Sequence, residues 1–436
     1  MNDSTVNNDK HETFGSAAGD ESRAANFDLR RIVDNAVRET PVADMHTHLF
    51  AAEFGDLNLF GIDELLNYHY LIAELFRYSS VSYADFWRME KCVQADLIWR
   101  TLFVENTPLS EATRGVIAVL QAFGLNTNAA NLSEAREFFA DQNANDFPAK
   151  VLAIANVSDV VMTNDPLDED EIKVWKSGAK IDARFHAALR LDRLLNGWTE
   201  AVPLINKQNY RVSNDLSEQS IKETRRFLDD WIAVMKPTYL GVSLPDDFAF
   251  PEDSARGKLL TEVVLPTCEN HNVALSLMIG VRRKVNPALK LAGDGLGRAD
   301  VSALSRICAA NPNVKILSTF LSRENQHELC VAARKFKNLM PFGCWWFVNN
   351  GSIISEITRE RIELLGTSFI PQHSDARVLD QLIYKWSFSR RIIADALFDS
   401  YANLERDGRR ATKAEIERDV KKMFSENFWN LVHQQK

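Results

Sequence analysis

The chain has 436 residues, of which 45% are hydrophobic and 25% are charged, and no uninterrupted apolar run reaches the length of a membrane span. Its formal net charge of -9, without a basic stripe interleaved with aromatic residues, argues against a nucleic-acid partner. We therefore expect a soluble globular protein that forms one large barrel or a few ordinary domains.

The chain opens with a polar tail, a helix and a strand. Residues 1–25 are rich in Asn, Asp, Ser and Gly and lack the apolar segment of a secretory signal, so they predict a disordered tail. The apolar spacing over residues 27–37 predicts a helix that ends before Pro41. The short apolar run that follows predicts a first strand over residues 42–46.

Residues 49–146 show helical periodicity and almost no strand signal. A connection of this length is too large for a simple crossover, so we interpret it as a helical insertion after the first strand. Such additions often wall a site or contact another subunit, which makes a homo-oligomer an open expectation. The predicted organisation is a tail (1–25), a barrel (26–48 and 147–436) and an insertion (49–146).

Beyond residue 146, short apolar runs alternate with helical stretches, as in a parallel sheet with helical crossovers. Together with 42–46, the predicted strands number eight, which favours a distorted (β/α)8 TIM barrel. A doubly wound sheet is the alternative, but no strand leads directly into a Gly-x-Gly-x-x-Gly loop. The seven later strands are predicted at 159–163, 181–189, 239–244, 273–279, 314–318, 340–345 and 368–373. Helices are predicted at 216–235, 258–270, 301–310, 326–336, 353–365, 392–401 and 412–432.

His46 and His48 form a His-x-His pair where the first strand ends. Residues i and i+2 of a strand point to the same side, so both imidazoles enter one cavity. Asp375 follows the eighth strand, which neighbours the first strand in a closed barrel. Two nitrogens and one carboxylate oxygen suit a divalent metal of the zinc type.

Several arginines follow the predicted strands, at the rim where barrel enzymes carry their chemistry. Arg190 and Asp192 follow the third strand, Arg282 follows the fifth, and Arg377 follows the eighth. Arginines that converge on one mouth suit a small anionic substrate, because the guanidinium binds a carboxylate through two hydrogen bonds. Trp345 and Trp346 near the seventh strand are either packing residues or substrate contacts.

The five cysteines are odd in number, widely scattered and without a Cys-x-x-Cys pair. They predict neither a disulfide framework nor a thiolate metal site. A reducing, cytoplasmic setting is therefore expected.

Seven motifs in order across residues 40–400 resemble those of the uronate isomerase (glucuronate isomerase) family, a branch of the amidohydrolase superfamily of metal-dependent barrels. The motifs are Asp44-Met45-His46-Thr47-His48-Leu49, His69-Tyr70 with Arg77, Thr163-Asn164-Asp165-Pro166-Leu167-Asp168, Arg190-Leu191-Asp192-Arg193, Gly280-Val281-Arg282-Arg283, Gly343-Cys344-Trp345-Trp346-Phe347 and Ser374-Asp375-Ala376-Arg377.

The resemblance implies an isomerase that interconverts aldo and keto sugar acids by proton transfer between C2 and C1. His46, His48 and Asp375 would hold a divalent metal, zinc being the expected ion. Tyr70, Asp375 and Arg377 would lie near the migrating proton. The expected contacts to a sugar-acid substrate are His69, Arg190, Asp192, Arg282, Trp345 and Trp346.

The chain departs from the family pattern at three positions where the family shows histidine, which are occupied by Met278, Asp247 and Trp386. These departures keep two alternatives open. One is a hydrolase or lyase of the same superfamily acting on a carboxylated substrate, with Asp375 as general base for a bound water. The other is a non-catalytic relative.

Overall fold

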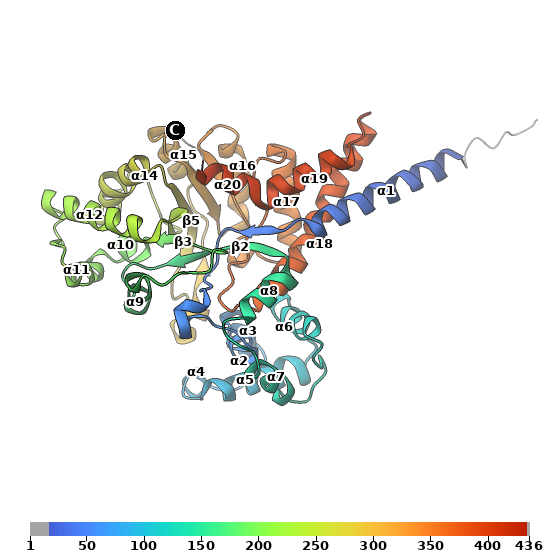
Figure 1. Cartoon of the computed structure of the whole chain (residues 1–436), viewed down its shortest axis with the longest axis horizontal. Helices are drawn as coiled ribbons and strands as arrows, with labels where there is room; N and C mark the ends of the chain where they lie inside the picture. The colour runs from blue at the N-terminus through green and yellow to red at the C-terminus, as the bar shows by residue number, and fades with distance from the viewer. Residues whose placement is uncertain (1–16, 434–436) are drawn as a thin grey trace, which may run out of the picture.

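The computed structural model describes residues 17–433, and a curled parallel sheet lies at its centre (Figure 1). The strand order is β1-β2-β3-β4-β5-β7-β8, and the short β6 pairs antiparallel with β5. This sheet with its surrounding helices confirms the predicted distorted barrel. The strands are β1 (Val42–Asp44), β2 (Val157–Asn164), β3 (Phe185–Arg190), β4 (Tyr239–Pro245), β5 (Ala274–Arg282), β6 (Gly295–Leu296), β7 (Ile316–Phe320) and β8 (Leu339–Pro341).

The eighth predicted strand, 368–373, is not a strand, and this prediction is corrected. Only one parallel bridge forms there, between Phe342 and Ile370. Pro371 has no N–H to donate to a ladder, and the Gln372 side chain accepts hydrogen bonds from the N–H groups of Cys344 and His373. Side chains thus take the place of the regular strand partners.

Residues 370–376 still close the barrel, because they bond to the chain on both sides. On one side the Ile370 N–H donates to the Pro341 carbonyl (3.1 Å). On the other side the Asp375 N–H donates to the His46 carbonyl (3.2 Å), and the His48 N–H donates to the Ala376 carbonyl (2.7 Å). We call residues 370–376 the seam segment.

The helices surround the sheet and fill the long β1–β2 connection. They are α1 (Ala17–Glu39), α2 (Ile62–Leu66), α3 (His69–Leu75), α4 (Tyr83–Phe86), α5 (Lys91–Trp99), α6 (Glu111–Ala122), α7 (Ser133–Ala140), α8 (Phe147–Ala155), α9 (Glu169–Ser177), α10 (Asp192–Asn196), α11 (Trp198–Lys207), α12 (Glu218–Met235), α13 (Ala255–Leu259), α14 (Leu265–His271), α15 (Val301–Ala310), α16 (Gln326–Ala333), α17 (Gly351–Leu365), α18 (Gln381–Arg406), α19 (Lys413–Lys421) and α20 (Asn427–His433). Short 3-10 or π segments are η1 (Ala52–Leu57), η2 (Arg100–Val104), η3 (Leu260–Val264), η4 (Pro287–Gly293), η5 (Arg323–Asn325), η6 (Trp346–Val348) and η7 (Lys422–Glu426).

Helix α1 begins at Ala17, ten residues before the predicted start at Phe27. The earlier part of the predicted disordered tail lies outside the described residues. Some predicted strand bounds also shift, since β3 begins at Phe185 and β8 ends at Pro341. No helix within residues 17–433 is both long and apolar enough to cross a lipid bilayer.

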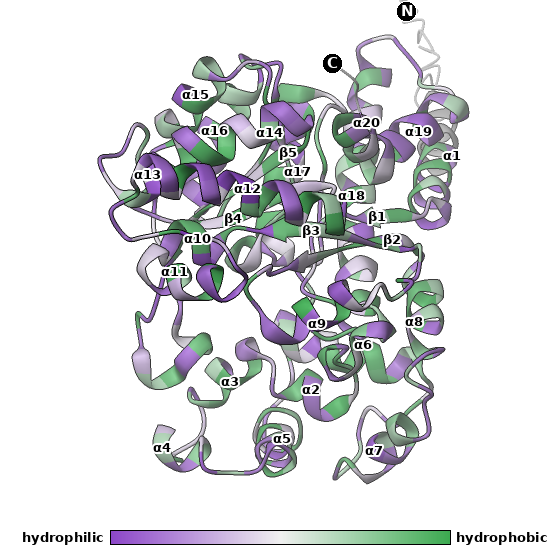
Figure 2. Ribbon diagram, turned by 60° about the vertical axis from the view of Figure 1, so that its left-hand side comes forward, coloured by the Kyte–Doolittle hydropathy of each residue, from purple (hydrophilic) through white to green (hydrophobic). Residues whose placement is uncertain are grey.

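Helices α2 to α7 gather on one side of the sheet, at the bottom of Figure 1. Green and purple stretches alternate along them in Figure 2, as expected for amphipathic helices with one buried face. Their buried residues share one apolar cluster with α1 and α18, so this part packs directly on the C-terminal helices.

The barrel interior has its own apolar cluster, which includes Ala43, Tyr239 and Met278 from three strands. Phe428 and Val432 of α20 belong to the same cluster. The last helix therefore packs against the interior residues of the sheet, while the His-x-His pair lies beyond β1 at the carboxyl end.

Candidate active site

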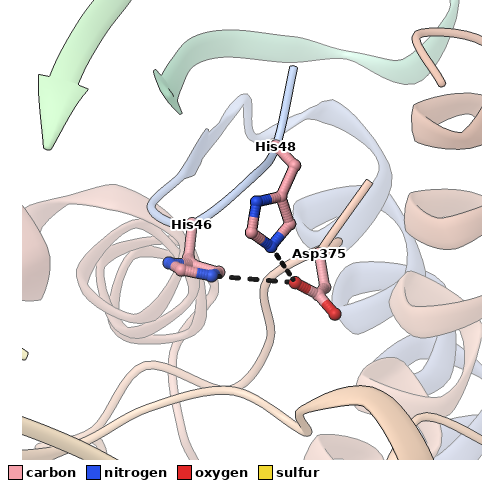
Figure 3. Close-up of side chains that lie close together, drawn as sticks. All are labelled: His46, His48 and Asp375. Carbon is pink, nitrogen blue, oxygen red and sulfur yellow. Dashed lines mark ion pairs between the residues drawn. The ribbon is translucent and has the colours of Figure 1, made fainter. Parts of the chain in front are cut away.

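The two imidazoles of His46 and His48 converge on one carboxylate oxygen (Figure 3). The distance from Asp375 Oδ1 to His46 Nε2 is 3.7 Å, and to His48 Nε2 it is 3.4 Å. Both histidines follow β1 and Asp375 lies in the seam segment, so barrel closure brings them together as predicted. The second oxygen of Asp375 points away from both rings in Figure 3.

Two hydroxyl groups fix which ring nitrogens carry hydrogen. The Tyr239 hydroxyl donates its one hydrogen to the Met45 carbonyl (3.0 Å), so it can only accept from His46 Nδ1 (2.8 Å). The Thr163 hydroxyl likewise donates to the Thr47 carbonyl (3.0 Å) and lies 2.8 Å from His48 Nδ1. Both histidines therefore carry their hydrogen on Nδ1 and turn an Nε2 lone pair toward Asp375.

This arrangement fits a divalent cation. Asp375 Oδ1 is buried without a hydrogen-bond partner among residues 17–433, and it faces two nitrogen lone pairs instead of donors. One ligand atom from each residue of the triad His46, His48 and Asp375 lies within 4.8 Å of the others. Burial lowers the pKa of His46 to about 3, which keeps this ring neutral and able to bind a metal.

The position of Asp375 depends on a second buried aspartate, Asp44. One oxygen of Asp44 accepts from the Ser374 N–H (3.0 Å), and the other accepts from the Trp386 indole N–H (2.8 Å). Burial raises the pKa of Asp44 to about 6. Asp375 itself has a φ of 52°, a left-handed conformation that aspartate tolerates better than most residues. Asp44 thus holds in place the turn at Ser374 and Asp375, which directs the Asp375 carboxylate toward His46 and His48.

His373 is a site residue that the sequence reasoning missed. Its ring lies edge-on to His46, with centroids 5.4 Å apart, and it is fully buried. Neither ring nitrogen has a hydrogen-bond partner within the described chain. Burial, followed by the nearby His46, lowers the pKa of His373 to about 3. Its place two residues before Asp375 was the available signal.

Two adjoining cavities meet at the triad, an inner one that Met278 lines and an outer one that Asp375 lines, and they share His48, Arg190 and Ser243. Arg190 is held by Asp192, whose carboxylate accepts from Nε at 3.0 Å and raises the pKa of the guanidinium. The outer cavity contains most of the predicted substrate contacts. Its lining residues include His48, His69, Arg190, Trp345, Trp346, Asp375 and Arg377, joined by Ser243, Arg283 and Leu291.

The structure does not bring Arg282 to this cavity. Its Nε pairs with Asp246 at 2.5 Å and its side chain is 58% exposed, whereas Arg283 lines the cavity. Tyr70 does not line the cavity either. It packs between Tyr68 and His69 of the same segment, against the barrel-interior cluster.

The three positions that lack a family histidine have different environments. Met278 lines the inner cavity beside the two metal-site histidines. Asp247 is exposed, and Trp386 is buried with its N–H on Asp44. Only Met278 therefore replaces a polar side chain at the cavity surface, and Trp386 retains a hydrogen-bond donor.

Loss of a hydroxyl that orients a histidine should weaken metal binding. We expect Tyr239→Phe to lower the affinity for a divalent metal by about 10–100-fold, because His46 Nδ1 loses its acceptor. Thr163→Val should do the same through His48. Competition with a chelating dye measures the affinity. Tyr401→Phe, which removes a hydroxyl bonded to Asp419, is the control and should bind metal normally. An unchanged metal affinity in Tyr239→Phe would contradict the role of Tyr239 in orienting His46.

Comparison with known proteins identifies a close structural relative. The fold superposes on a uronate isomerase from Bacillus halodurans C-125 with a TM-score of 0.92 and 52% sequence identity, covering 94% of this chain and 97% of that one. No protein-family model matches the sequence. A search of curated proteins also finds no match.

More distant structures share the fold alone. A uronate isomerase from Thermotoga maritima is 15% identical with a TM-score of 0.76, over 93% of this chain and 97% of that one. Glucuronate isomerase from Caulobacter crescentus is 16% identical with a TM-score of 0.70, over 99% and 98%.

Proposed function

The chain belongs to the uronate isomerase family, and we propose that it interconverts the aldo and keto forms of a uronate by moving a proton between C2 and C1. The observation that supports this most strongly is the 52% identity to a uronate isomerase over nearly the full length of both chains. The cavity chemistry agrees with it, because one carboxylate lies among arginines that suit an acid substrate.

His46, His48 and Asp375 would hold the divalent metal, and the N, N and O donor set makes zinc our proposed ion. When bound, the metal would supply positive charge next to the substrate oxygens. The hydroxyl groups of Tyr239 and Thr163 bond to the Nδ1 atoms of His46 and His48, so the Nε2 atoms of both rings stay unprotonated and available to this metal.

Asp375 is our candidate for the group that carries the proton. Its outward oxygen accepts the proton from C2 and returns it to C1 on the same face of a planar cis-enediol. A single carboxyl group thus serves both half-reactions, because C1 and C2 are adjacent. Exchange with water during the lifetime of the enediol would place solvent hydrogen on the product.

Arg190 and Arg377 supply the positive charge that an acidic sugar and an enediolate both require. Arg190 is fixed by Asp192, so its orientation is set before substrate binds. His69, Trp345 and Trp346 form the wall against which the carbon chain would lie. Tyr70 does not line the cavity itself, but its ring packs against His69, which does, so Tyr70 is our candidate for the hydroxyl that exchanges a proton with a substrate oxygen when the substrate is bound.

The test is an assay of the purified protein with D-glucuronate and a panel of related sugar acids. We expect a ketose product that gains deuterium at C1 when the reaction runs in heavy water. Turnover of the panel without ketose and without deuterium uptake would reject the proposal. A hydrolase function has weaker support, since a putative metal-dependent hydrolase from Lactobacillus casei ATCC 334 shares only 14% identity, with a TM-score of 0.54.

We also propose a cytoplasmic location, which the five unpaired cysteines support. Residues 49–146 are proposed as an insertion that walls the site, because His69 of α3 lines the cavity. Association into a homo-oligomer stays a prediction.

A further inference from the structure

Lys385 of α18 is a buried lysine close to the site, and no step described above uses it. Its side chain is only 3% exposed, and its Nζ has no hydrogen-bond partner within residues 17–433. A buried ammonium without hydrogen bonds is costly, so its surroundings must stabilise the charge in another way.

Three side chains surround this ammonium. The Glu111 carboxylate, at the start of α6, lies 3.6 Å from Nζ. The ring faces of Tyr70 and Tyr384 each lie with their centroids 5.2 Å from Nζ, a distance suited to cation–π attraction. Gly115 of α6 leaves room for the Tyr384 ring, because a Cβ there would come within 2.6 Å of it. The packing of α6 on α18 thus sets the ammonium against Tyr70.

We propose that Lys385 is a positioning residue that acts through Tyr70, holding the ring in place and favouring negative charge on its hydroxyl during isomerisation. The inference rests on the proposed function, in which Tyr70 exchanges a proton with a substrate oxygen. Neither Lys385 nor Tyr70 lines the cavity, so the effect of Lys385 on the substrate passes through Tyr70 and through His69, whose ring packs on Tyr70 and lines the cavity.

Glu111 and Lys385 carry opposite charges near the Tyr70 ring, so removing one charge or the other should shift the pKa of the Tyr70 phenol in opposite directions. A nearby cation favours the ionised phenol and a nearby anion disfavours it. Burial raises the pKa of Tyr70, and Glu111 is among the groups that raise it further. The other titratable or charged groups that face Tyr70 and its neighbour His69 come from three segments: Tyr68 and His69, Asp375 and Arg377, and Tyr384.

The variants are Lys385→Met, which keeps the length and loses the charge, Lys385→Arg, which keeps the charge, and Glu111→Gln. For uronate isomerisation we expect Lys385→Met to lower kcat by about tenfold with KM within about twofold. In Lys385→Met, the alkaline limb of the plot of kcat against pH should move to higher pH, because the Tyr70 phenol is harder to ionise without the nearby cation. Glu111→Gln should move that limb to lower pH, and Lys385→Arg should restore it.

A second measurement does not depend on the substrate. With 3-fluorotyrosine placed at position 70, fluorine NMR follows the titration of this phenol in the full-length protein. The same order of pKa values is expected, highest in Lys385→Met and lowest in Glu111→Gln. Circular dichroism checks that each variant is folded, and if Lys385→Met does not fold, the Glu111→Gln and Lys385→Arg results decide.

Equal phenol pKa values in wild type, Lys385→Met and Glu111→Gln would overturn the inference, as would a Lys385→Arg enzyme as impaired as Lys385→Met. An inert wild-type protein would instead reject the proposed function. In that case the NMR titration still tests the link between Lys385 and Tyr70.

Discussion

Asp375→Asn should lower kcat for uronate isomerisation by about 10²–10⁴-fold, the range in which general acid–base groups contribute. The amide keeps the shape of the carboxylate, but it cannot accept the proton from C2. It also replaces the oxygen that faces His46 and His48 by a weaker ligand or by an N–H group. Steady-state formation of ketose gives kcat, and deuterium uptake from heavy water reports the proton-transfer step directly.

Asp229→Asn is the matched control. Asp229 is half exposed on α12, where it pairs with His271 at 2.7 Å, so this variant should retain wild-type turnover. Deuterium uptake in Asp375→Asn at the wild-type rate would show that another group moves the proton. Metal content, measured on the same samples, separates the loss of the base from the loss of the ion.

Gly343→Ala should lower the free energy of unfolding by about 2–5 kcal/mol, through backbone strain and overpacking together. Gly343 has a φ of 61°, where a Cβ is unfavourable. A Cβ here would also come within 1.8 Å of His373 Nδ1. The fully buried His373 ring packs between Phe342 and His46, so it has little room to move. Urea denaturation followed by circular dichroism measures the change.

Gly178→Ala separates the two effects. Gly178 has a φ of 73°, and a Cβ there would meet nothing within 4 Å. Gly178→Ala should therefore lower the free energy of unfolding only by the cost of the backbone conformation, about 1–2 kcal/mol. Equal destabilisation by the two substitutions would mean that the contact with His373 costs nothing.

The sequence was sufficient to predict the barrel and the meeting of His46, His48 and Asp375 at one point. Apolar runs alternating with helical stretches identified β1 to β5, β7 and β8 but not the short β6, and the two-residue period of a strand placed His46 and His48 on one side. Residues 368–373, which overlap the seam segment, were predicted as a strand because they contain the short apolar run Phe369-Ile370. Its actual bonding depends on Gln372 and Asp44, whose side chains replace ladder partners, and no strand periodicity reveals that.

The residues that orient the site were beyond sequence reasoning. Tyr239 lies 193 positions from His46 and Thr163 lies 115 positions from His48, so only the folded barrel joins them. Tyr239 stands in no pattern that distinguishes it from ordinary strand residues, and the motif that begins at Thr163 does not reveal its contact with His48. His373 was read as the end of a strand, although its closeness to Asp375 in the chain could have marked it.

Arg283 lines the cavity and Arg282 does not, for a local reason. Met278 faces the barrel interior, and strict alternation would turn Arg282 to the same side. Gly280 interrupts the alternation, because its φ of 120° accompanies a register shift opposite Leu244 and Pro245. Val281 then faces the interior, Arg282 turns outward and Arg283 lines the cavity. A glycine near a strand end was the only hint.

The seam segment is joined to its neighbours by a few backbone hydrogen bonds, whereas β4 and β5 share a long ladder. Local fluctuations that part the barrel wall should therefore begin between His46 and Asp375. These two residues stand on opposite sides of the gap and share one binding site. Whatever occupies that site must leave before the wall can part, so occupancy of the site should itself stabilise the closure of the barrel.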